Sequence, residues 1–388
     1  MKIKTGVIGM GYIGVTHLET LRRLPFIEIV AVADVNQELA GKWAKIFGIE
    51  KCYSTIEEML ANEEIQVIHN CTPNHMHFDI NKKVLAAGRH IFSEKPLTGD
   101  LKEARELVRI RRQHPGVVAG VDFCYRMYPL IREMRERVLA GELGTPRLVH
   151  GEYLQDWLLY DTDYNWRVES QYGGKSRCVA DIGSHWLDLA QCVTNSKVIE
   201  VCAHTVTALP YRKKPKKAVG TFTVAAADSE METVKVDTED YAGVLLKFDN
   251  GASGVMQCSQ ISAGRKCFID LEVDGETASF HWNHEHPNHM WKGKRDTQNQ
   301  EIMRNPLLAP LTAGQKGHLG AGHAEGWNDA LKNNMEAFYQ AVLGEQSEAQ
   351  CGFATFEDAL YIIEITEAIL KSAEDGRWVK VNQISKEE

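Results

Sequence analysis

The first third of the chain alternates short apolar runs with amphipathic stretches, and this regular alternation constrains the fold more than any other feature. The short runs predict strands, and the stretches between them repeat apolar residues at helical spacing. Strands that alternate with helices predict a parallel sheet that is covered by helices on both faces. The expected strands are residues 3–10, 27–35, 65–72, 90–95 and 117–129, and the expected helices are residues 12–25, 37–48, 77–89 and 101–113.

The second part of the chain has a different pattern, in which β-rich segments follow one another without regular helices between them. Asn250-Gly251 and Asp274-Gly275 predict tight hairpin turns, so neighbouring strands are expected to be antiparallel. Residues 290–325 are expected to form a long loop. The β-rich segments are residues 147–157, 198–209, 241–261 and 266–284, and the two expected closing helices are residues 325–344 and 355–376.

The sequence GMGYIG, residues 9–14, lies between the first expected strand and the first expected helix and has the pattern GxGxxG. In this context the pattern predicts a dinucleotide site. Gly9 allows the tight turn, Gly11 lets the backbone approach the pyrophosphate, and Gly14 lets helix and strand pack closely. The start of the helix, at Tyr12 and Ile13, then faces the phosphates with unsatisfied N–H groups.

Asp34 follows Gly14 by twenty residues, at the end of the second expected strand. A carboxylate there accepts hydrogen bonds from the adenosine ribose and repels a 2′-phosphate, so we expect NAD rather than NADP as the cofactor. The alternative is a glycine-rich turn with an exposed acid beside it.

These features predict an α/β protein with two domains, which 388 residues can accommodate. Residues 1–122 are expected to form an NAD-binding Rossmann domain, a doubly wound parallel sheet. Residues 123–388 are expected to form an α+β domain for substrate binding and oligomerisation, with a large, mainly antiparallel open sheet. The outer face of that sheet is expected to seal a homo-oligomer, either a dimer or a tetramer.

Glu94, Lys95 and Pro96 end an expected strand, and ligands bind outside the carboxyl ends of strands in open α/β sheets. The proline restricts Lys95 to an extended backbone, so its side chain has a reproducible direction. We expect the ammonium to bind a substrate hydroxyl and to stabilise negative charge on that oxygen. The alternative is a surface ion pair of Glu94 and Lys95.

Asp181 and His185 are four residues apart, which places both side chains on one face of a helix. A carboxylate raises the basicity of a nearby imidazole, and histidine titrates near neutrality, as a base for an alcohol proton should. The alternative is a capping aspartate and a packed polar histidine.

Residues 151–167 mix aromatic side chains with amides and carboxylates, a mixture that suits a sugar or polyol. Of these residues we expect Gln155 and Trp157 to contact substrate, although aromatic residues more often belong to a core. His323 and Glu325 follow the expected long loop, where a substrate contact and a helix cap are both compatible with the sequence.

Composition and residue spacing argue against several other kinds of partner and site. A net charge of −9 and a pI near 6.0 argue against nucleic acid or an anionic membrane as a partner. The basic run at residues 211–220 is expected to be a solvated loop. Nine cysteines without a CxxC pair predict a cytoplasmic protein without disulfides. The four histidines at residues 281–289 fit no standard ligand spacing, so no metal is expected.

Together these motifs resemble those of the Gfo/Idh/MocA oxidoreductases: GxGxxG at Gly9–Gly14, TPNHMH at Thr72–His77, EKP at residues 94–96, and the Asp181–His185 pair. The resemblance implies a catalytic triad of Lys95, Asp181 and His185. His185 would accept the proton, Lys95 would assist, and Asp181 would hold the substrate. It also implies cofactor contacts from the loops after two strands, at Thr72, Pro73, Asn74, His77, Glu94 and Lys95.

Four further stretches, YLQDW, TDYNWR, EHPNHMW and GHAEGW, are similar to the branch of that family that includes levoglucosan dehydrogenase and glucoside 3-dehydrogenases. Those enzymes oxidise the C3 hydroxyl of a pyranose. The resemblance implies a sugar pocket lined by Tyr125, Gln155 and Trp157.

The expected function is therefore an NAD-dependent dehydrogenase of a sugar or cyclic polyol. The alternatives are an inositol dehydrogenase, an NAD-dependent glycoside hydrolase, which regenerates NAD in each turnover, and a non-catalytic dinucleotide-binding regulator. Fold alone does not separate them.

Overall fold

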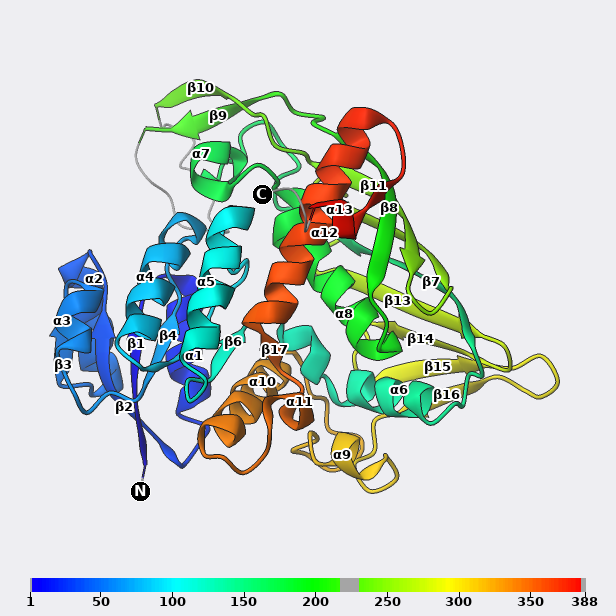
Figure 1. Ribbon diagram of the computed structural model, residues 1–388, viewed down its shortest axis with the longest axis horizontal. Helices are drawn as coiled ribbons and strands as arrows, with labels where there is room; N and C mark the ends of the chain where they lie inside the picture. Colours follow the sequence, from blue (N-terminus) through cyan, green and yellow to red (C-terminus); the bar gives the residue numbers. More distant parts are fainter. Residues whose placement is uncertain (1, 217–229, 385–388) are drawn as a thin grey trace. The chain divides into compact units, whose positions relative to one another are not determined.

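The computed structural model describes residues 2–216 and 230–384, and its internal contacts group into two units (Figure 1). The first unit comprises Met1–Cys124 and Asn328–Tyr361, and the second comprises Tyr125–Trp327 and Ile362–Glu388. The predicted division at residue 122 is close to the first of these boundaries. Its assignment of cofactor binding to one side and of substrate binding and oligomerisation to the other stays a prediction.

The first unit contains a seven-stranded sheet in the order β17-β6-β5-β4-β1-β2-β3. All neighbouring strands are parallel except β17, which pairs antiparallel with β6 at one edge. The order reverses at β1 and β4, as a doubly wound sheet requires, so the predicted Rossmann topology is confirmed. The strands are β1 (Ile3–Ile8), β2 (Ile27–Ala33), β3 (Lys51–Tyr53), β4 (Val67–Asn70), β5 (His90–Ser93), β6 (Ala119–Val121) and β17 (Ala354–Thr355).

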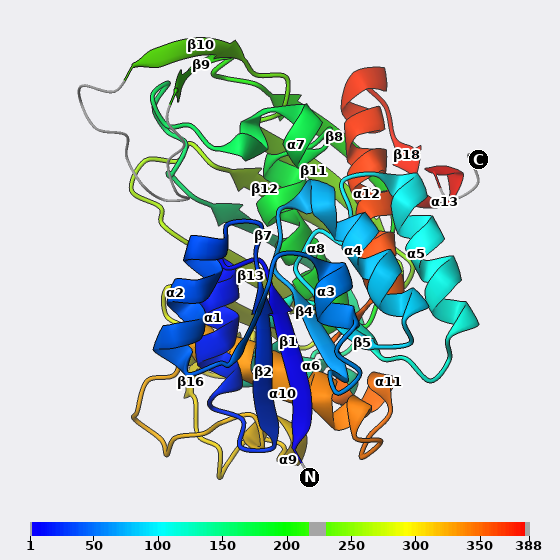
Figure 2. The same ribbon diagram turned by 90° about the vertical axis from the view of Figure 1, so that its left-hand side faces the viewer.

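Helices cover both faces of this sheet. In Figure 2, α3, α4 and α5 lie together on one face, and α1 and α2 lie on the other. The first turn of α5 is capped by a residue next to it in sequence: the Asp100 side chain accepts hydrogen bonds from the N–H groups of Lys102 and Glu103. The helices are α1 (Tyr12–Leu21), α2 (Gln37–Phe47), α3 (Ile56–Leu60), α4 (Asn74–Ala86), α5 (Leu101–Gln113), α10 (Trp327–Val342) and α11 (Glu348–Cys351).

Helix α10 comes from the end of the chain but packs on the first sheet. A Cβ at Gly120 of β6 would lie 3.0 Å from the Phe338 ring, so glycine leaves room for that ring. Phe338 also packs edge-on against Phe92 of β5, with ring centroids 5.1 Å apart. The apolar face of α10 is therefore buried on strands that precede it by more than 200 residues.

The second unit contains a nine-stranded sheet in the order β16-β15-β14-β13-β7-β12-β11-β8-β18. Only β7 and β12 pair in parallel, so the predicted mainly antiparallel sheet is confirmed. The strands of this unit are β7 (Pro146–Leu154), β8 (Val198–Val206), β11 (Tyr241–Phe248), β12 (Ser253–Ser259), β13 (Phe268–Gly275), β14 (Ser279–Asn283), β15 (His289–Gly293), β16 (Gln300–Met303) and β18 (Val379–Lys380), with β9 (Tyr211–Pro215) and β10 (Met231–Lys235) forming a separate pair.

Helices pack on one face of the nine-stranded sheet, where α8 lies against β7 and β13 and α6 lies against β14. The predicted hairpins at Asn250-Gly251 and Asp274-Gly275 join β11 to β12 and β13 to β14. The remaining helical segments are η1 (Cys124–Met127), α6 (Pro129–Leu139), η2 (Trp166–Val168), α7 (Ser170–Gly173), η3 (Val179–Gly183), α8 (Ser184–Thr194), α9 (Leu311–Gly314), α12 (Phe356–Asp375) and α13 (Val381–Ile384).

Three local predictions are wrong. The strand expected at residues 117–129 ends at Val121, because η1 follows and Pro129 starts α6, where its missing N–H costs nothing. The loop expected at residues 290–325 contains β16, the end of β15 and α9. The basic run expected to be a solvated loop forms strand β9 over its first half, and Arg212 is fully buried; residues 217–220 lie outside the described residues.

None of the helices in the described ranges combines the length and the hydrophobicity that crossing a bilayer requires.

Candidate functional site

The glycine loop joins β1 to α1 in the first unit. Gly9 follows β1 with a φ of +92°, a left-handed conformation that favours glycine. Its N–H donates to the Ala33 oxygen of β2 at 2.8 Å. A Cβ at Gly9 would lie 2.6 Å from the backbone oxygen of Cys71, which follows β4. Gly9 therefore makes the tight turn in a place where three strand ends meet.

Gly14 and Gly11 differ in what surrounds them. A Cβ at Gly14 would lie 1.8 Å from the Gly9 oxygen, so only glycine lets α1 start this close to the loop. At Gly11, a Cβ would have none of the described atoms within 4 Å. Gly11 also precedes α1 without a capping side chain. Open space and uncapped helical N–H groups fit the phosphates of a dinucleotide.

Asp34 lies directly beside this loop, at the end of β2. One oxygen of its carboxylate accepts a hydrogen bond from the Met10 N–H at 2.6 Å, and the other accepts one from the Asn36 N–H at 2.8 Å. The Tyr12 side chain is exposed and Ile13 is half-buried. The carboxylate keeps lone pairs for ribose hydroxyls, so the residues present fit NAD.

Two loops follow β4 and β5, and the His77 side chain connects them. Its ring nitrogens lie 2.7 Å from the backbone oxygens of Thr72 and Pro96. Thr72 also donates from its hydroxyl to the Asn70 side chain at 2.7 Å. Pro73 precedes α4, and Asn74 is its first residue. His77 is fully buried and connects the two loops, and its contact with the cofactor stays a prediction.

Glu94 and Lys95 form the second of these loops. Glu94 is buried, and the Lys95 side chain is half-buried. One Glu94 oxygen accepts a hydrogen bond from the Lys95 N–H at 3.3 Å, and the other lies 3.0 Å from the Nε2 atom of His17. The alternative of an isolated surface ion pair does not describe Glu94, because Glu94 is buried and one of its oxygens contacts a buried histidine.

In the second unit, Asp181 is held by residues that have no motif in the sequence. Its carboxylate accepts a hydrogen bond from the Gln260 amide at 2.8 Å, and Arg167 lies 3.5 Å away. Arg177 donates to the Gln260 oxygen at 3.2 Å and also pairs with the buried Asp240. Asp181 lies in the π-helical turn η3, directly before α8, and Gly183 occupies the N-cap position of α8, so the alternative of a capping aspartate is not observed.

His185 lies in the first turn of α8 among aromatic side chains. Its ring is nearly perpendicular to the Tyr125 ring, with centroids 4.9 Å apart, and the Tyr153 ring is 6.3 Å away. The Tyr125 and Tyr153 hydroxyl oxygens are 3.0 Å apart, and the Gln155 amide donates to Tyr153 at 3.2 Å. Three residues predicted from the sequence, Tyr125, Gln155 and His185, thus surround Tyr153.

Cys267 and His284 extend this group. The Cys267 sulfur lies 3.2 Å from the Tyr153 hydroxyl and 3.3 Å from the Tyr125 hydroxyl. Burial opposes ionisation of the thiol, but hydrogen bonds from His284 and both tyrosines lower the pKa of Cys267. Burial also lowers the pKa of His284, but the Cys267 thiol raises it to a larger extent. The group offers hydroxyl, amide and imidazole donors in one place.

Two predicted substrate residues lie elsewhere in the second unit. Trp157 packs with Tyr164 against a small core of Leu158, Val168 and Val236. His323 is exposed, and its backbone oxygen accepts a hydrogen bond from Arg304. Glu325 is buried and binds the N–H groups of His318 and Leu319, so it stabilises a loop rather than capping α10.

Sequence reasoning missed Tyr153, Gln260, Cys267 and His284. Tyr153 belongs to a strand pattern, and its burial gives no functional signal. His284 lies within the histidine-rich stretch, whose spacing fits no standard metal site and indicates no contact with Tyr153 or Cys267. Gln260 follows β12 as an ordinary polar residue, and nothing in the sequence indicates that it reaches Asp181.

Two family models match the chain: an NAD-binding Rossmann-fold model of an oxidoreductase family matches residues 3–123, and a GFO/IDH/MocA C-terminal domain model matches residues 131–281. They divide the chain close to the structural boundary. The chain belongs to the Gfo/Idh/MocA family of oxidoreductases. It is an NAD-binding enzyme of the sugar and polyol dehydrogenase group within that family.

Three relatives illustrate the range of similar sequences. Levoglucosan dehydrogenase of Pseudarthrobacter phenanthrenivorans is 27% identical over 99% of both chains. The uncharacterized oxidoreductase YrbE of Bacillus subtilis is 30% identical over 67% of both chains. Glucose-6-phosphate 3-dehydrogenase of Bacillus subtilis is 24% identical over 74% of this chain and 76% of its own.

Solved structures similar to this chain also belong to sugar and polyol dehydrogenases or their homologs. Levoglucosan dehydrogenase in complex with NADH and L-sorbose superimposes with a TM-score of 0.88, at 25% identity, over 99% of this chain and all of that chain. An inositol dehydrogenase homolog from Azotobacter vinelandii with bound NAD+ superimposes with a TM-score of 0.85, at 25% identity, over 98% and 97% of the two chains. Both contain the cofactor that Asp34 and the glycine loop predict.

Proposed function

We propose that this enzyme oxidises a secondary hydroxyl, at C3, of a pyranose such as levoglucosan or a glucoside. Bound NAD supplies the hydride acceptor. His185 removes the hydroxyl proton, and Lys95 stabilises the negative charge that develops on the oxygen. Asp181 orients the substrate.

The surroundings of His185 and Asp181 are the observation that supports this assignment best. The Tyr125 and Tyr153 rings pack against the imidazole, and the Gln155 amide binds the Tyr153 hydroxyl. These hydroxyl and amide groups can hydrogen-bond several hydroxyls of one ring. The Gln260 amide holds Asp181 in one orientation. A polyhydroxylated ring makes use of such a set, whereas a simple alcohol does not.

The relatives support the substrate class and the carbon. Levoglucosan dehydrogenase is similar over the whole length, and its solved structures contain NADH with a sugar. The name glucose-6-phosphate 3-dehydrogenase supports C3 as the position. A second candidate substrate is a cyclic polyol such as an inositol, which the Azotobacter neighbour favours.

A panel assay tests the proposal. Purified protein is incubated with NAD and, separately, with levoglucosan, methyl glucosides, glucose, myo-inositol and scyllo-inositol, and NADH is measured at 340 nm. We expect NADH in stoichiometric amounts with levoglucosan or a glucoside. Preference for an inositol would retain the mechanism and replace the substrate. Glycoside cleavage without accumulation of NADH would indicate a hydrolase, and binding of NAD without turnover would indicate a regulator.

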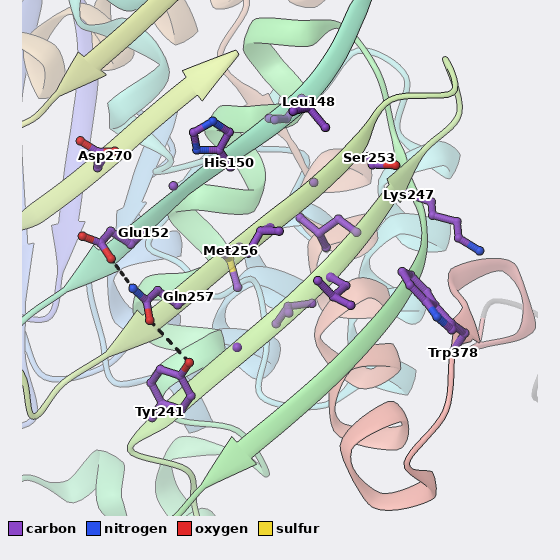
Figure 3. Close-up of a pocket in the computed structure, with 18 residues that line it drawn as sticks. Leu148, His150, Glu152, Tyr241, Lys247, Ser253, Met256, Gln257, Asp270 and Trp378 are labelled. Atoms are coloured by element: carbon purple, nitrogen blue, oxygen red, sulfur yellow. Dashed lines mark hydrogen bonds between the residues drawn. The ribbon is translucent and has the colours of Figure 1, made fainter. Parts of the chain in front are cut away.

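We also propose that the open face of the nine-stranded sheet binds a second copy of this chain. Leu148, Leu245 and Val255 point outward there and are each about half-exposed. Figure 3 shows this face, and the hollow over it has a volume of about 970 Å³. An apolar patch that crosses neighbouring strands is typical of a subunit interface.

Light scattering tests the oligomer: we expect a dimer or a tetramer, and Val255→Glu should shift the mass toward the monomer. A monomeric mass for the unaltered protein would contradict the proposal. We further propose a cytoplasmic location, because all nine cysteines lie in the described ranges and each is a free thiol.

A further inference from the structure

A buried polar cluster lies under the Lys95 loop and has no part in the function proposed above. We call it the His17 cluster, and all of its members belong to the first unit. His17 of α1 is at its centre and is fully buried. The other members, which come from β1, β4, α10 and the loops after β5 and β6, are Thr5, His69, Glu94, Asp122, Asn334 and Tyr339.

The charges in this cluster require a cation between two acids. The His17 Nε2 atom lies 3.0 Å from a Glu94 oxygen and 3.7 Å from an Asp122 oxygen. Two carboxylates buried this close cannot both be ionised without a compensating charge. Burial lowers the pKa of His17, but Cys71, Asp122 and Glu94 raise it to a larger extent. Burial and the neighbouring Glu94 raise the pKa of Asp122 to about 6.

The hydrogen bonds on the other side of His17 are consistent with that charge. The Nδ1 atoms of His17 and His69 are 3.0 Å apart, so one of them must donate. A charged His17 donates from both nitrogens, which makes the Nδ1 atom of a neutral His69 the acceptor. Burial and the charge on His17 lower the pKa of His69, as this arrangement requires.

The remaining hydrogen bonds of the cluster are compatible with this assignment of donors and acceptors. A neutral His69 that accepts at Nδ1 carries its proton on Nε2, which lies 2.9 Å from the Tyr339 hydroxyl oxygen. Tyr339 in turn lies 2.8 Å from the Thr5 hydroxyl. On the acid side, Asn334 donates to the second Asp122 oxygen at 2.8 Å. Each hydrogen bond from Glu94 through His17 and His69 to Tyr339 can thus join a donor to an acceptor.

We propose that His17 is a positioning residue for Lys95 and acts through Glu94; this inference rests on the role proposed for Lys95. Glu94 has one oxygen on His17 and the other on the Lys95 N–H at 3.3 Å. Burial raises the pKa of Glu94, but the charges of His17 and Lys95 lower it to a larger extent. The Lys95 ammonium is therefore the cation that remains for this carboxylate when His17 is removed. That side chain would then turn toward Glu94 and away from the substrate oxygen.

Three variants test the inference: His17→Phe, His17→Gln and Tyr339→Phe. We expect His17→Phe to lower kcat on levoglucosan about 10- to 100-fold, because displacement of a catalytic group by about 1 Å has effects of that size. The Kd for NAD, measured by calorimetry, should stay within twofold. His17→Gln keeps an amide donor for Glu94 and should recover most of kcat.

Tyr339→Phe is the matched control, because it removes a buried hydroxyl from the same cluster but leaves the contact between His17 and Glu94. It should lower the urea midpoint and leave kcat within twofold. If the decrease in kcat parallels the decrease in the urea midpoint in all three variants, the cluster only stabilises the fold, and the inference is overturned. A value of kcat for His17→Phe equal to that of the unaltered enzyme would overturn it as well.

Two further variants separate this inference from the proposed function. Lys95→Ala with full turnover would contradict the role of Lys95, whatever His17 does. If Lys95→Ala is inactive, the pair His17→Phe and Glu94→Gln decides the rest. Since His17 acts through Glu94, His17→Phe should change kcat less than twofold in the Glu94→Gln background, although it lowers kcat about 10- to 100-fold alone. Independent, multiplicative effects would overturn the inference. His17→Asn, whose shorter side chain also breaks the contact with Glu94, replaces His17→Phe in this comparison if the latter does not fold.

Discussion

Gly11 directly precedes α1 and Gly14 lies in its first turn, yet alanine should affect two different properties of the enzyme at these positions. In Gly14→Ala the new Cβ would lie 1.8 Å from the Gly9 oxygen, a distance that Cβ atoms do not adopt. The neighbouring atom belongs to the backbone, so either α1 or the loop must move by about 1 Å. Overpacking of this kind costs about 1–3 kcal/mol, and a backbone clash belongs at the upper end of that range.

In Gly11→Ala the new Cβ has none of the described atoms within 4 Å, and its φ of −69° is ordinary for alanine. Stability without NAD should therefore change by less than about 1 kcal/mol. The methyl group would instead occupy the space that fits the pyrophosphate. We expect the Kd for NAD to rise at least tenfold, which corresponds to about 1.4 kcal/mol of binding free energy.

Urea denaturation without NAD, followed by tryptophan fluorescence, and titration calorimetry with NAD measure the two properties separately. The expected result is a lower urea midpoint for Gly14→Ala only, and a large loss of affinity in Gly11→Ala without a loss of stability. Equal stability of Gly14→Ala and the unaltered protein would refute the packing argument. Normal NAD binding by Gly11→Ala would refute the placement of the pyrophosphate.

Three further predictions follow from single side chains. Asp34→Ala should raise the ratio of kcat/KM for NADP to that for NAD at least tenfold; an unchanged ratio would contradict the cofactor argument. Asp240→Asn leaves the buried Arg177 and Arg212 without their carboxylate, so it should lower the free energy of unfolding in urea by about 3–5 kcal/mol. A loss below about 1 kcal/mol would be inconsistent with that pairing. A hydrogen bond to Asp270 raises the pKa of His281, so its stabilisation is present below about pH 6.5 and is lost as the pH rises through the raised value. His281→Gln should therefore destabilise the protein by up to about 1 kcal/mol at pH 5.5 and have no effect at pH 9, and an equal effect at both values would refute this reasoning.

The first sheet could be predicted from the sequence because its signals are local. Strand and helix periods follow each other directly, and the role of Gly14 depends on atoms only five residues away. For the nine-stranded sheet, the two hairpin turns predict that neighbouring strands are mainly antiparallel. Its order could not be predicted, because the parallel pair β7 and β12 joins segments about 100 residues apart.

Contacts between residues that are distant in sequence could not be predicted. The basic run gave no reason to expect a buried Arg212, which is compensated by Asp240 and by backbone oxygens of residues 158–163. Helix 327–342 has an apolar face, but its pattern does not say which sheet it covers. Trp157 packs against a small core formed by Leu158, Val168 and Val236, and its contact with a sugar stays a prediction.

Transfer of deuterium from C3 of the sugar to the cofactor tests the central claim most directly. Levoglucosan that carries deuterium at C3 only is oxidised with NAD, and the reduced cofactor is analysed by mass spectrometry. The account predicts one deuterium in every molecule of reduced cofactor and a 3-keto product. Unlabelled NADH, with deuterium retained in the product, would show that another carbon is oxidised and would contradict the proposed function.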